Sequence, residues 1–368
     1  MLVALLAAVR ALSFASTGLF MSAASANASG TALEEYLRAA AFACTSPWNV
    51  STSPEYVSSV AIQSVGDGEG GGKLYGTALD RMIPALRCIP QMYVGTTIPR
   101  SRDFYCGDVL NSTFTARAIQ SSAAAARAFV ERYGATLEFA WYIAPEQFLN
   151  HFAEGCTPKS DAAARITASA LAAAWGAFLR EWTEALAAVR PRTRILWSPA
   201  APESPVRGSN TSAAYAAMLR ASLRTIAASA PLLTDIAIQD SVGKASNAST
   251  VGTIEYPVGC VDAAWHANIS KAAFAAPAAA GSTDAAGSAA GPAAGSAAGT
   301  ALNVTTVVNM ELFLRKGRRS PASAIIDIPG DPLELRRRAV CYEAHGLAVG
   351  PSWEARYWLR DLTEVWQQ

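Results

Sequence analysis

Short runs rich in β-branched and aromatic residues alternate along this chain with longer runs in which apolar residues recur at helical spacing. The longer runs end at residues that stop helices, such as Gly134, Pro191 and Pro231. The last one opens with Asp331-Pro332, a capping residue followed by proline at the first helical position. The pattern predicts helices over residues 115–133, 161–190, 211–229 and 332–346. It predicts eight strands, over residues 12–22, 57–64, 91–97, 136–144, 194–199, 235–242, 305–312 and 346–351.

The order of these elements favours a parallel sheet, because each helix precedes a strand and so forms a crossover connection. Both a doubly wound sheet and a barrel show this alternation. Eight strands in 368 residues fit an α/β fold of the (β/α)8 TIM barrel type, which typically occupies about 250 residues. We therefore expect a single barrel over residues 12–368.

One stretch departs from the alternation. Residues 272–300 consist almost wholly of Ala, Gly, Ser and Pro, a composition that cannot bury enough apolar surface to offset the entropy of ordering. We interpret it as a disordered low-complexity loop insertion between the sixth and seventh strands, a place where barrels tolerate extra residues.

The first residues allow two interpretations. Residues 1–9 are apolar and the small residues 22–26 suit a signal peptidase, so residues 1–11 could belong to a signal peptide or apolar leader. However, Arg10 interrupts the apolar segment and no basic residue precedes it. In the other interpretation residues 12–22 form the first barrel strand, which cleavage after Ala26 would remove.

Charge and hydropathy exclude some partners. Thirty Lys and Arg residues against twenty-nine Asp and Glu residues give a formal net charge of +1, without a polybasic run that would bind phosphate backbones. We therefore expect no nucleic-acid partner. Beyond the N-terminal leader, no segment reaches about 18 unbroken apolar residues, so no membrane insertion is predicted there.

Asparagine and cysteine positions indicate the secretory pathway or an extracellular location. Chance would place about one or two of nine asparagines in N-glycosylation sequons, whereas seven lie in them: Asn27, Asn49, Asn111, Asn210, Asn247, Asn268 and Asn303. The chain is therefore predicted to be a glycoprotein.

An even number of cysteines permits up to three disulfides, and buried free thiols are the alternative. Cys106 and Cys156 follow the third and fourth strands, and Cys44 and Cys88 lie near the ends of the first two helices, so we expect each of these pairs to be neighbours. The remaining two are Cys260 and Cys341.

The chemistry of a parallel barrel lies at the carboxyl ends of its strands, so the residues there are the candidates. The fourth strand ends with two aromatic residues and then a carboxylate, and the seventh ends with an amide and a carboxylate. Aromatic faces stack on sugar rings, amides and carboxylates bind hydroxyl groups, and two carboxyl groups can cleave a glycosidic bond. The candidate catalytic residues are Glu146 and Glu311, and the candidate substrate-binding residues are Trp141, Tyr142, Trp197, Gln239, Asp240, Asn309 and Trp353.

Four motifs at successive strand ends carry a resemblance. They read Trp141-Tyr142-Ile-Ala-Pro-Glu146, Trp197-Ser-Pro199, Gln239-Asp-Ser-Val-Gly243 and Asn309-Met-Glu-Leu-Phe313. In order and spacing the chain resembles the uncharacterised glycosidase-like TIM barrels called domain of unknown function 4434, from about residue 12 to residue 353. That family is similar to the retaining glycoside hydrolases, which implies Glu146 as acid/base, Glu311 as nucleophile and no cofactor. Pro145 stands where that superfamily usually has Asn.

Structural roles remain open for the same residues. Glu146 could stabilise a helix N-terminus, and Asp240 could cap a turn or orient Glu311 or a sugar hydroxyl. Trp141, Tyr142 and Trp353 could belong to the core. The three histidines match no metal-ligand spacing and no serine lies in a GxSxG motif, which disfavours zinc and serine hydrolases.

The leading hypothesis is therefore a retaining glycoside hydrolase that acts on a carbohydrate substrate. Its two carboxyl groups would lie about 5–5.5 Å apart. The alternatives are a non-catalytic carbohydrate-binding barrel or an interaction scaffold.

Overall fold

The structure is a computed structural model of the 368-residue chain. It describes residues 17–45, 57–68, 71–99, 101, 104–202, 209–241, 247–248, 254–255, 259–275, 304–309, 313–316, 326–329, 332–349 and 351–352.

The chain folds as a (β/α)8 barrel, as its alternating pattern predicts. Every neighbouring pair of barrel strands is parallel, in the order β12-β9-β6-β5-β4-β3-β2-β1-β13. The two outermost strands are separated by a single residue in the sequence; β12 pairs with β9 and β13 pairs with β1, so the ring closes. The strands are β1 (Thr17–Met21), β2 (Val57–Ile62), β3 (Gln91–Gly95), β4 (Ala140–Ile143), β5 (Ile195–Trp197), β6 (Asp235–Gln239), β9 (Thr305–Asn309), β12 (Ala348–Val349) and β13 (Pro351–Ser352).

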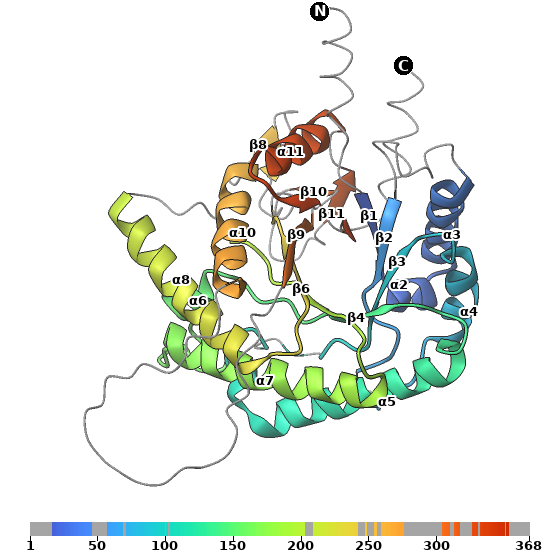
Figure 1. The fold of residues 1–368 in the computed structure, drawn as a ribbon, viewed down its shortest axis with the longest axis horizontal. Coiled ribbons are helices and arrows are strands. Elements are labelled where there is room, and N and C mark those ends of the chain that lie inside the picture. Colours follow the sequence, from blue (N-terminus) through green and yellow to red (C-terminus); the bar gives the residue numbers. More distant parts are fainter. Residues whose placement is uncertain are drawn as a thin grey trace, which may run out of the picture.

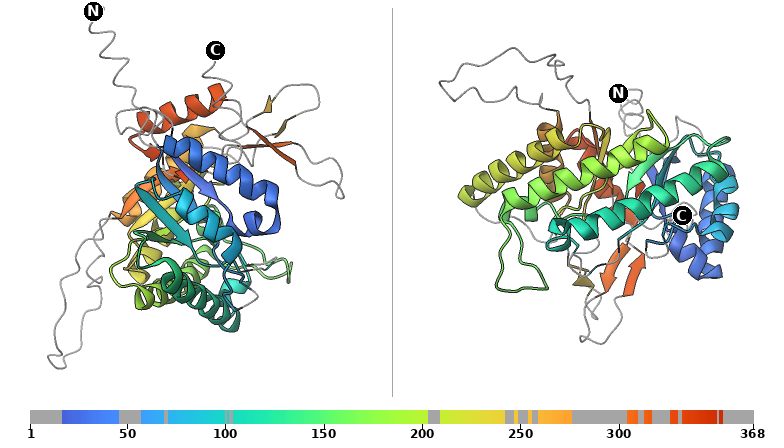
Figure 2. Two further views of the ribbon diagram at one scale, coloured as in Figure 1. Left: turned by 90° about the vertical axis from the view of Figure 1, so that its right-hand side faces the viewer. Right: turned by 90° about the horizontal axis from the view of Figure 1, so that it is seen from below.

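Helices surround the strands on all sides (Figures 1 and 2). They are α2 (Ala23–Ala28), α3 (Gly30–Thr45), α4 (Gly76–Ala85), α5 (Ser112–Tyr133), α6 (His151–Glu154), α7 (Ala168–Val189), α8 (Ser209–Ser229), α10 (Cys260–Phe274) and α11 (Pro332–Ala344), with the short 3-10 helix η1 (Asp108–Leu110) before α5. The predicted helix ends at Gly134 and before Pro191 are confirmed within one residue. Asn111 caps α5 through its Oδ1, which accepts from the backbone N of Thr113 and Phe114.

Several predicted boundaries differ from the structure, and two of the differences have a clear reason. The helix expected from residue 161 begins only at Ala168, because Cys156 and Ile166 exchange backbone hydrogen bonds of 3.0 and 2.9 Å and hold the intervening segment in a loop. Residues 272–274, expected to belong to the insertion, instead continue α10 to Phe274, whose ring is buried. The rest of that insertion, residues 276–303, lies outside the described residues.

The first barrel strand lies where one of the two N-terminal interpretations placed it. Residues Thr17–Met21 form β1, which pairs with β2 on one side and β13 on the other. Leu19 and Met21 are buried against the helices, and Phe20 is buried inside the barrel. Residues 1–16, including the predicted leader, lie outside the described part of the chain.

Side chains of each strand alternate between two buried layers. The inner layer fills the barrel with a mixture of small and large residues: Phe20, Ala61, Tyr93, Ala140, Tyr142, Ala144, Leu196 and Ala237. The outer layer packs against the helices and includes Val60, Val94, Trp141, Trp197, Ile236 and Val308. The barrel is therefore a packed core, and a ligand can reach it only at its two ends.

A second, four-stranded sheet was not predicted. It consists of β7 (Asn247–Ala248), β8 (Ile254–Glu255), β10 (Phe313–Lys316) and β11 (Ile326–Pro329), in the order β11-β10-β7-β8. Its strands belong to the connections that follow β6 and β9, so they arise at the carboxyl-terminal face of the barrel.

Three disulfides join segments that are distant in sequence. The predicted neighbours are confirmed: Cys44 and Cys88 have Cα atoms 5.6 Å apart, and Cys106 and Cys156 have Cα atoms 5.9 Å apart. Cys260 and Cys341 form the third bridge and join α10 to α11. The bridge between Cys106 and Cys156 ties the loop after β3 to the loop after β4.

His266 gives the fold a pH-dependent stability. Its Nδ1 lies 2.7 Å from the carbonyl oxygen of Asp262, which can only accept, so Nδ1 carries the proton and Nε2 accepts from the Tyr215 hydroxyl at 3.1 Å. Burial lowers the pKa of His266 from 6.5 to about 4. Between pH 6.5 and about pH 4, His266 is therefore protonated in the unfolded chain and neutral in the folded chain. The free energy of unfolding falls as the pH is lowered through this range.

We expect acidification from pH 7 to pH 4 to remove up to about 3 kcal/mol of unfolding free energy through this group. Urea unfolding of His266→Gln should show a correspondingly weaker pH dependence than the wild-type chain. The exposed His345→Gln serves as the control and should keep the wild-type dependence. An unchanged pH dependence in His266→Gln would contradict this account.

Candidate active site

Glu146 follows β4 at the carboxyl-terminal end of the barrel. The strand ends at Ile143, and the buried Pro145 carries the chain over the rim, where its carbonyl oxygen accepts a hydrogen bond of 3.2 Å from Nε1 of Trp197. The next residue, Gln147, is fully buried, and its Nε2 donates to the carbonyl oxygen of Tyr105 at 2.7 Å. These bonds fix the backbone on both sides of Glu146, whose side chain is half-buried.

Tyr142 lies close to Glu146 inside the barrel. Its side chain is fully buried and meets the ring of Phe20 edge to face, with 5.8 Å between the ring centroids. Burial raises the pKa of the Tyr142 hydroxyl well above its usual value, and the negative charge of Glu146 raises it further. Tyr142 therefore remains a neutral hydrogen-bond donor next to a carboxylate.

Neighbouring strands contribute two amide or hydroxyl side chains to the same end of the barrel. Nε2 of the buried Gln239 lies 3.4 Å from both the carbonyl oxygen and the hydroxyl of Ser198. The Ser198 hydroxyl also acts on the pKa of Tyr142, which places the three residues together. The structure thus brings together Tyr142 of β4 and Gln239 of β6, which the sequence predicts as site residues, and Ser198, which directly follows β5.

An aromatic cluster beside Glu146 was missed in the sequence. Tyr105 and Phe148 are half-buried, their ring centroids lie 5.8 Å apart, and His151 meets Phe148 edge to face at the same distance. The disulfide between Cys106 and Cys156 joins the two loops that carry them. Tyr105 also lies near enough to affect the pKa of Tyr142. The sequence feature that indicates this cluster is Tyr105 next to Cys106, after the third strand.

Trp141 and Trp197 do not lie at the mouth, which corrects their predicted role in substrate binding. Both are fully buried in the layer that faces the helices, Trp141 against Phe139 and Trp197 stacked on Trp175 at 5.8 Å. Tyr142 points into the barrel, so the side chain before it in the strand must point outward.

Asp240 also faces away from the mouth. It is fully buried, and its Oδ2 accepts hydrogen bonds from Nη1 of Arg338 at 2.8 Å and from the hydroxyl of Tyr342 at 2.9 Å. Asp240 shares the outward side of β6 with Ile236 and Ile238, and both of its partners belong to α11. Its position therefore indicates a structural ion pair in place of the expected contact with a sugar.

The remaining predicted site residues are Asn309, Glu311 and Trp353. Asn309 is the last residue of β9, at the same end of the barrel as Glu146, and its side chain lies outside the described part of the structure. Glu311 and Trp353 lie outside the described residues. In the sequence Glu311 follows Asn309 by two positions.

The described residues offer neither a metal site nor a membrane span. They contain no group of three or more His, Cys, Asp or Glu side chains arranged to hold a metal ion. None of the helices within the described ranges is long and apolar enough to cross a membrane.

No protein-family model and no curated protein matches this sequence. Among solved structures, a candidate alpha-L-fucosidase from Bacteroides thetaiotaomicron superposes with a TM-score of 0.52 at 11% identity, covering 96% of this chain and 92% of that one. An intracellular xylanase from Thermoanaerobacterium saccharolyticum gives 0.46 at 6% identity, covering 93% and 86%. A xylanase from Paenibacillus barcinonensis gives 0.43 at 10% identity, covering 94% and 85%. The first of these, at a TM-score of 0.52, agrees with a barrel fold, and at 11% identity the likeness extends to the fold alone.

Proposed function

We propose that this protein is a retaining glycoside hydrolase in which Glu146 is the acid/base and Glu311 is the nucleophile. Glu146 donates a proton to the glycosidic oxygen while the carboxylate of Glu311 attacks the anomeric carbon and forms a glycosyl ester. Glu146, now a carboxylate, then accepts a proton from a water molecule, and the water oxygen displaces Glu311. The reaction needs no cofactor.

The observation that carries the proposal is the position of Glu146. It lies at the carboxyl end of β4, half-buried, on a backbone fixed by the bonds of Pro145 and Gln147. A half-buried carboxyl group can exchange protons with a substrate and with solvent, which general acid/base catalysis requires. Glu311 follows the strand that is three positions away in the ring, so the proposal predicts that the two groups face each other across the mouth.

The surroundings of Glu146 suit a carbohydrate. Tyr105 and Phe148 offer partly exposed aromatic faces. Tyr142 and Gln239 are fully buried, so they support the mouth from inside the barrel. The pair of Tyr105 and Phe148 takes the place that the sequence analysis gave to Trp141 and Trp197. Resemblance to domain of unknown function 4434 remains a prediction.

The three disulfides are of the kind that persists in an oxidising compartment, which supports the secretory pathway or an extracellular location. Of the predicted glycosylation sites, Asn27 and Asn111 are exposed. Asn268 is half-buried, and its Nδ2 lies 3.5 Å from the carbonyl oxygen of His345. We therefore propose Asn27 and Asn111 as glycan carriers before Asn268.

Replacing Tyr105 with Ala is expected to weaken saccharide binding about tenfold, because an aromatic contact of about 1.5 kcal/mol is lost. The fold should persist, since the disulfide between Cys106 and Cys156 still ties the loop down. Tyr133→Ala, on the outer helix α5, is the matched control and should bind as the wild type does. Equal affinities of the Tyr105→Ala variant and the wild-type chain for the same oligosaccharide would rule out the aromatic cluster as a sugar platform.

The function is tested by assaying the purified chain against aryl glycosides and polysaccharides for both product release and binding. A hydrolase releases sugar, and its Glu146→Gln variant retains binding with greatly reduced turnover. A carbohydrate-binding barrel binds without release. A chain that neither binds nor cleaves any member of the panel would refute the proposal and favour an interaction scaffold.

A further inference from the structure

A groove of about 460 Å³ lies on the outer surface of the barrel, between α5 and α7. The two helices lie side by side along one flank of the molecule (Figures 1 and 2). The groove is lined by Ala123, Arg127, Val130 and Glu131 of α5 and by Ala185, Ala188 and Val189 of α7. These residues belong to the second half of each helix, so the groove is separate from the mouth that carries Glu146.

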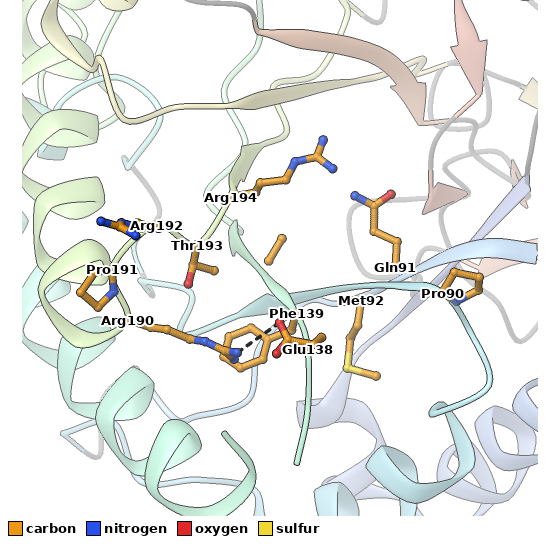
Figure 3. A pocket seen from close by; sticks show the side chains of 11 residues that line it. Pro90, Gln91, Met92, Glu138, Phe139, Arg190, Pro191, Arg192, Thr193 and Arg194 are labelled. Carbon is orange, nitrogen blue, oxygen red and sulfur yellow. Dashed lines mark hydrogen bonds and ion pairs between the residues drawn. The ribbon is translucent and has the colours of Figure 1, made fainter. Parts of the chain in front are cut away.

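Buried contacts hold both walls of the groove in place. On α5, the ring of Phe129 is fully buried and meets Phe139 edge to face, with 5.3 Å between the ring centroids. At the end of α7, Arg190 directly follows the groove residue Val189, and its Cζ lies 4.3 Å from the centroid of the Phe139 ring (Figure 3). Nη1 of Arg190 also donates to the carbonyl oxygen of Leu137 at 3.1 Å. The groove is therefore formed before a partner binds, and association need not order its walls.

Apolar side chains make up most of the lining. Val130, Ala185 and Val189 are half-buried and Ala188 is exposed, so methyl groups face solvent along the groove. Covering them removes apolar surface from water, which favours association. The charges at the edge of the groove decide which partner fits.

Two opposite charges border the groove, about one helical turn apart. Arg127 and Glu131 both line it and are exposed, and neither has a hydrogen bond or an ion pair with any described residue. The adjacent Arg132 differs, because its Nε donates to Asp80 of α4 at 3.0 Å. A positive and a negative charge side by side on one helix are complementary to a second copy of that helix running in the opposite direction.

The predicted glycosylation sites leave this surface bare. Neither α5 nor α7 contains an asparagine. Asn111, which precedes α5, stands about 24 Å from Arg127 along the helix axis. Because an N-linked glycan is bulky and lies over the surface around it, a face without such sites is one that another protein can cover.

We propose that this groove binds a second copy of the chain in a symmetric dimer. A two-fold axis perpendicular to α5, at the level of Phe129, sets the α5 helices of the two copies antiparallel. Each α5 then lies in the groove between α5 and α7 of the other copy, and Arg127 of each copy faces Glu131 of the other. The two ion pairs set the register, and the apolar lining supplies the buried area. The dimer is independent of the proposed glycosidase chemistry, because the groove does not reach the mouth.

Sedimentation velocity of the intact chain at about 1–200 μM tests the proposal. We expect the wild-type chain to pass from monomer to dimer within this range, because a small interface of this kind binds with an affinity near the micromolar limit. Arg127→Glu presents two carboxylates and Glu131→Arg presents two guanidinium groups, so each variant places like charges face to face. Each should dimerise at least about tenfold more weakly than the wild type. An equimolar mixture of the two variants should recover the dimer, because their charges are opposite.

Arg117→Glu is the matched control, because it reverses an exposed arginine of the same helix outside the groove. It should dimerise as the wild type does. A wild-type chain that stays monomeric throughout the range would overturn the proposal. Equal dimerisation of Arg127→Glu and Arg117→Glu would overturn it as well, since the dimer would then use another face. A mixture of Arg127→Glu and Glu131→Arg that stays monomeric would refute the pairing of these two charges.

Discussion

Replacing Glu146 with Gln is expected to lower kcat for glycosides with poor leaving groups by about 10²–10⁴-fold. The glutamine amide cannot donate the proton that an alkoxide leaving group needs. Aryl glycosides whose phenolate leaves without protonation should lose much less in the first step. The measurement is therefore the ratio of kcat/KM values, which report the first step, for a poor and a good leaving group in the variant and in the wild-type chain.

Two further variants make this result interpretable. Glu131→Gln, an exposed glutamate on the outer helix α5, removes one carboxylate without touching the mouth and should keep wild-type kcat. Glu311→Gln should lose turnover on both kinds of substrate, because the nucleophile is needed whatever the leaving group. If Glu146→Gln hydrolysed poor and good leaving groups at wild-type rates, its role as acid/base would be refuted.

Replacing Arg338 with Ala is expected to lower the free energy of unfolding by about 3–5 kcal/mol. The side chains of Arg338 and Asp240 are 1% and 0% exposed, so the variant leaves a buried carboxylate without its cation. The loss would also loosen α11 from β6, although the disulfide between Cys260 and Cys341 still holds α11 to α10. Urea unfolding monitored by circular dichroism measures the change.

The ion pair between Arg81 and Glu34 gives the matched comparison, because its side chains are 50% and 55% exposed. Arg81→Ala should cost less than about 1 kcal/mol, since solvent screens that pair. Comparable losses from Arg81→Ala and Arg338→Ala would contradict the structural role assigned to Asp240.

The barrel could be predicted because the sequence patterns that indicate it, for strands and for helices, are local. Eight runs of β-forming residues separated by helices with clear stops specify crossover connections, and crossovers specify a parallel sheet. The same order predicts the disulfide between Cys106 and Cys156, because loops after neighbouring strands lie side by side, and the one between Cys44 and Cys88, because the ends of neighbouring helices do.

The direction of individual side chains could not be predicted. Barrel strands are buried on both faces, so Phe139 to Ile143 reads as an unbroken apolar run without the alternation that would separate inside from outside. Trp141 was therefore assigned to the mouth with Tyr142, although only Tyr142 points into the barrel. For Asp240 the deciding partner, Arg338, lies 98 residues away along the chain.

The second sheet and the start of α7 could not be predicted, for different reasons. The strands of the second sheet are two to four residues long, too short to show any periodicity. The segment before Ala168 is rich in alanine and so appears helical, but its exchange of hydrogen bonds between Cys156 and Ile166 is a tertiary contact that no local pattern reveals.

We propose that Glu311 is the nucleophile of a double displacement assisted by Glu146. The most direct measurement is peptide mass mapping of the chain after reaction with aryl fluoroglycosides of several sugars, which form a long-lived glycosyl ester with a retaining enzyme. We expect one fluoroglycosyl group per chain, on the peptide that contains Glu311, and none in Glu311→Gln. A label on another carboxylate, or turnover of the parent glycoside by a chain that the fluoroglycoside never labels, would contradict it.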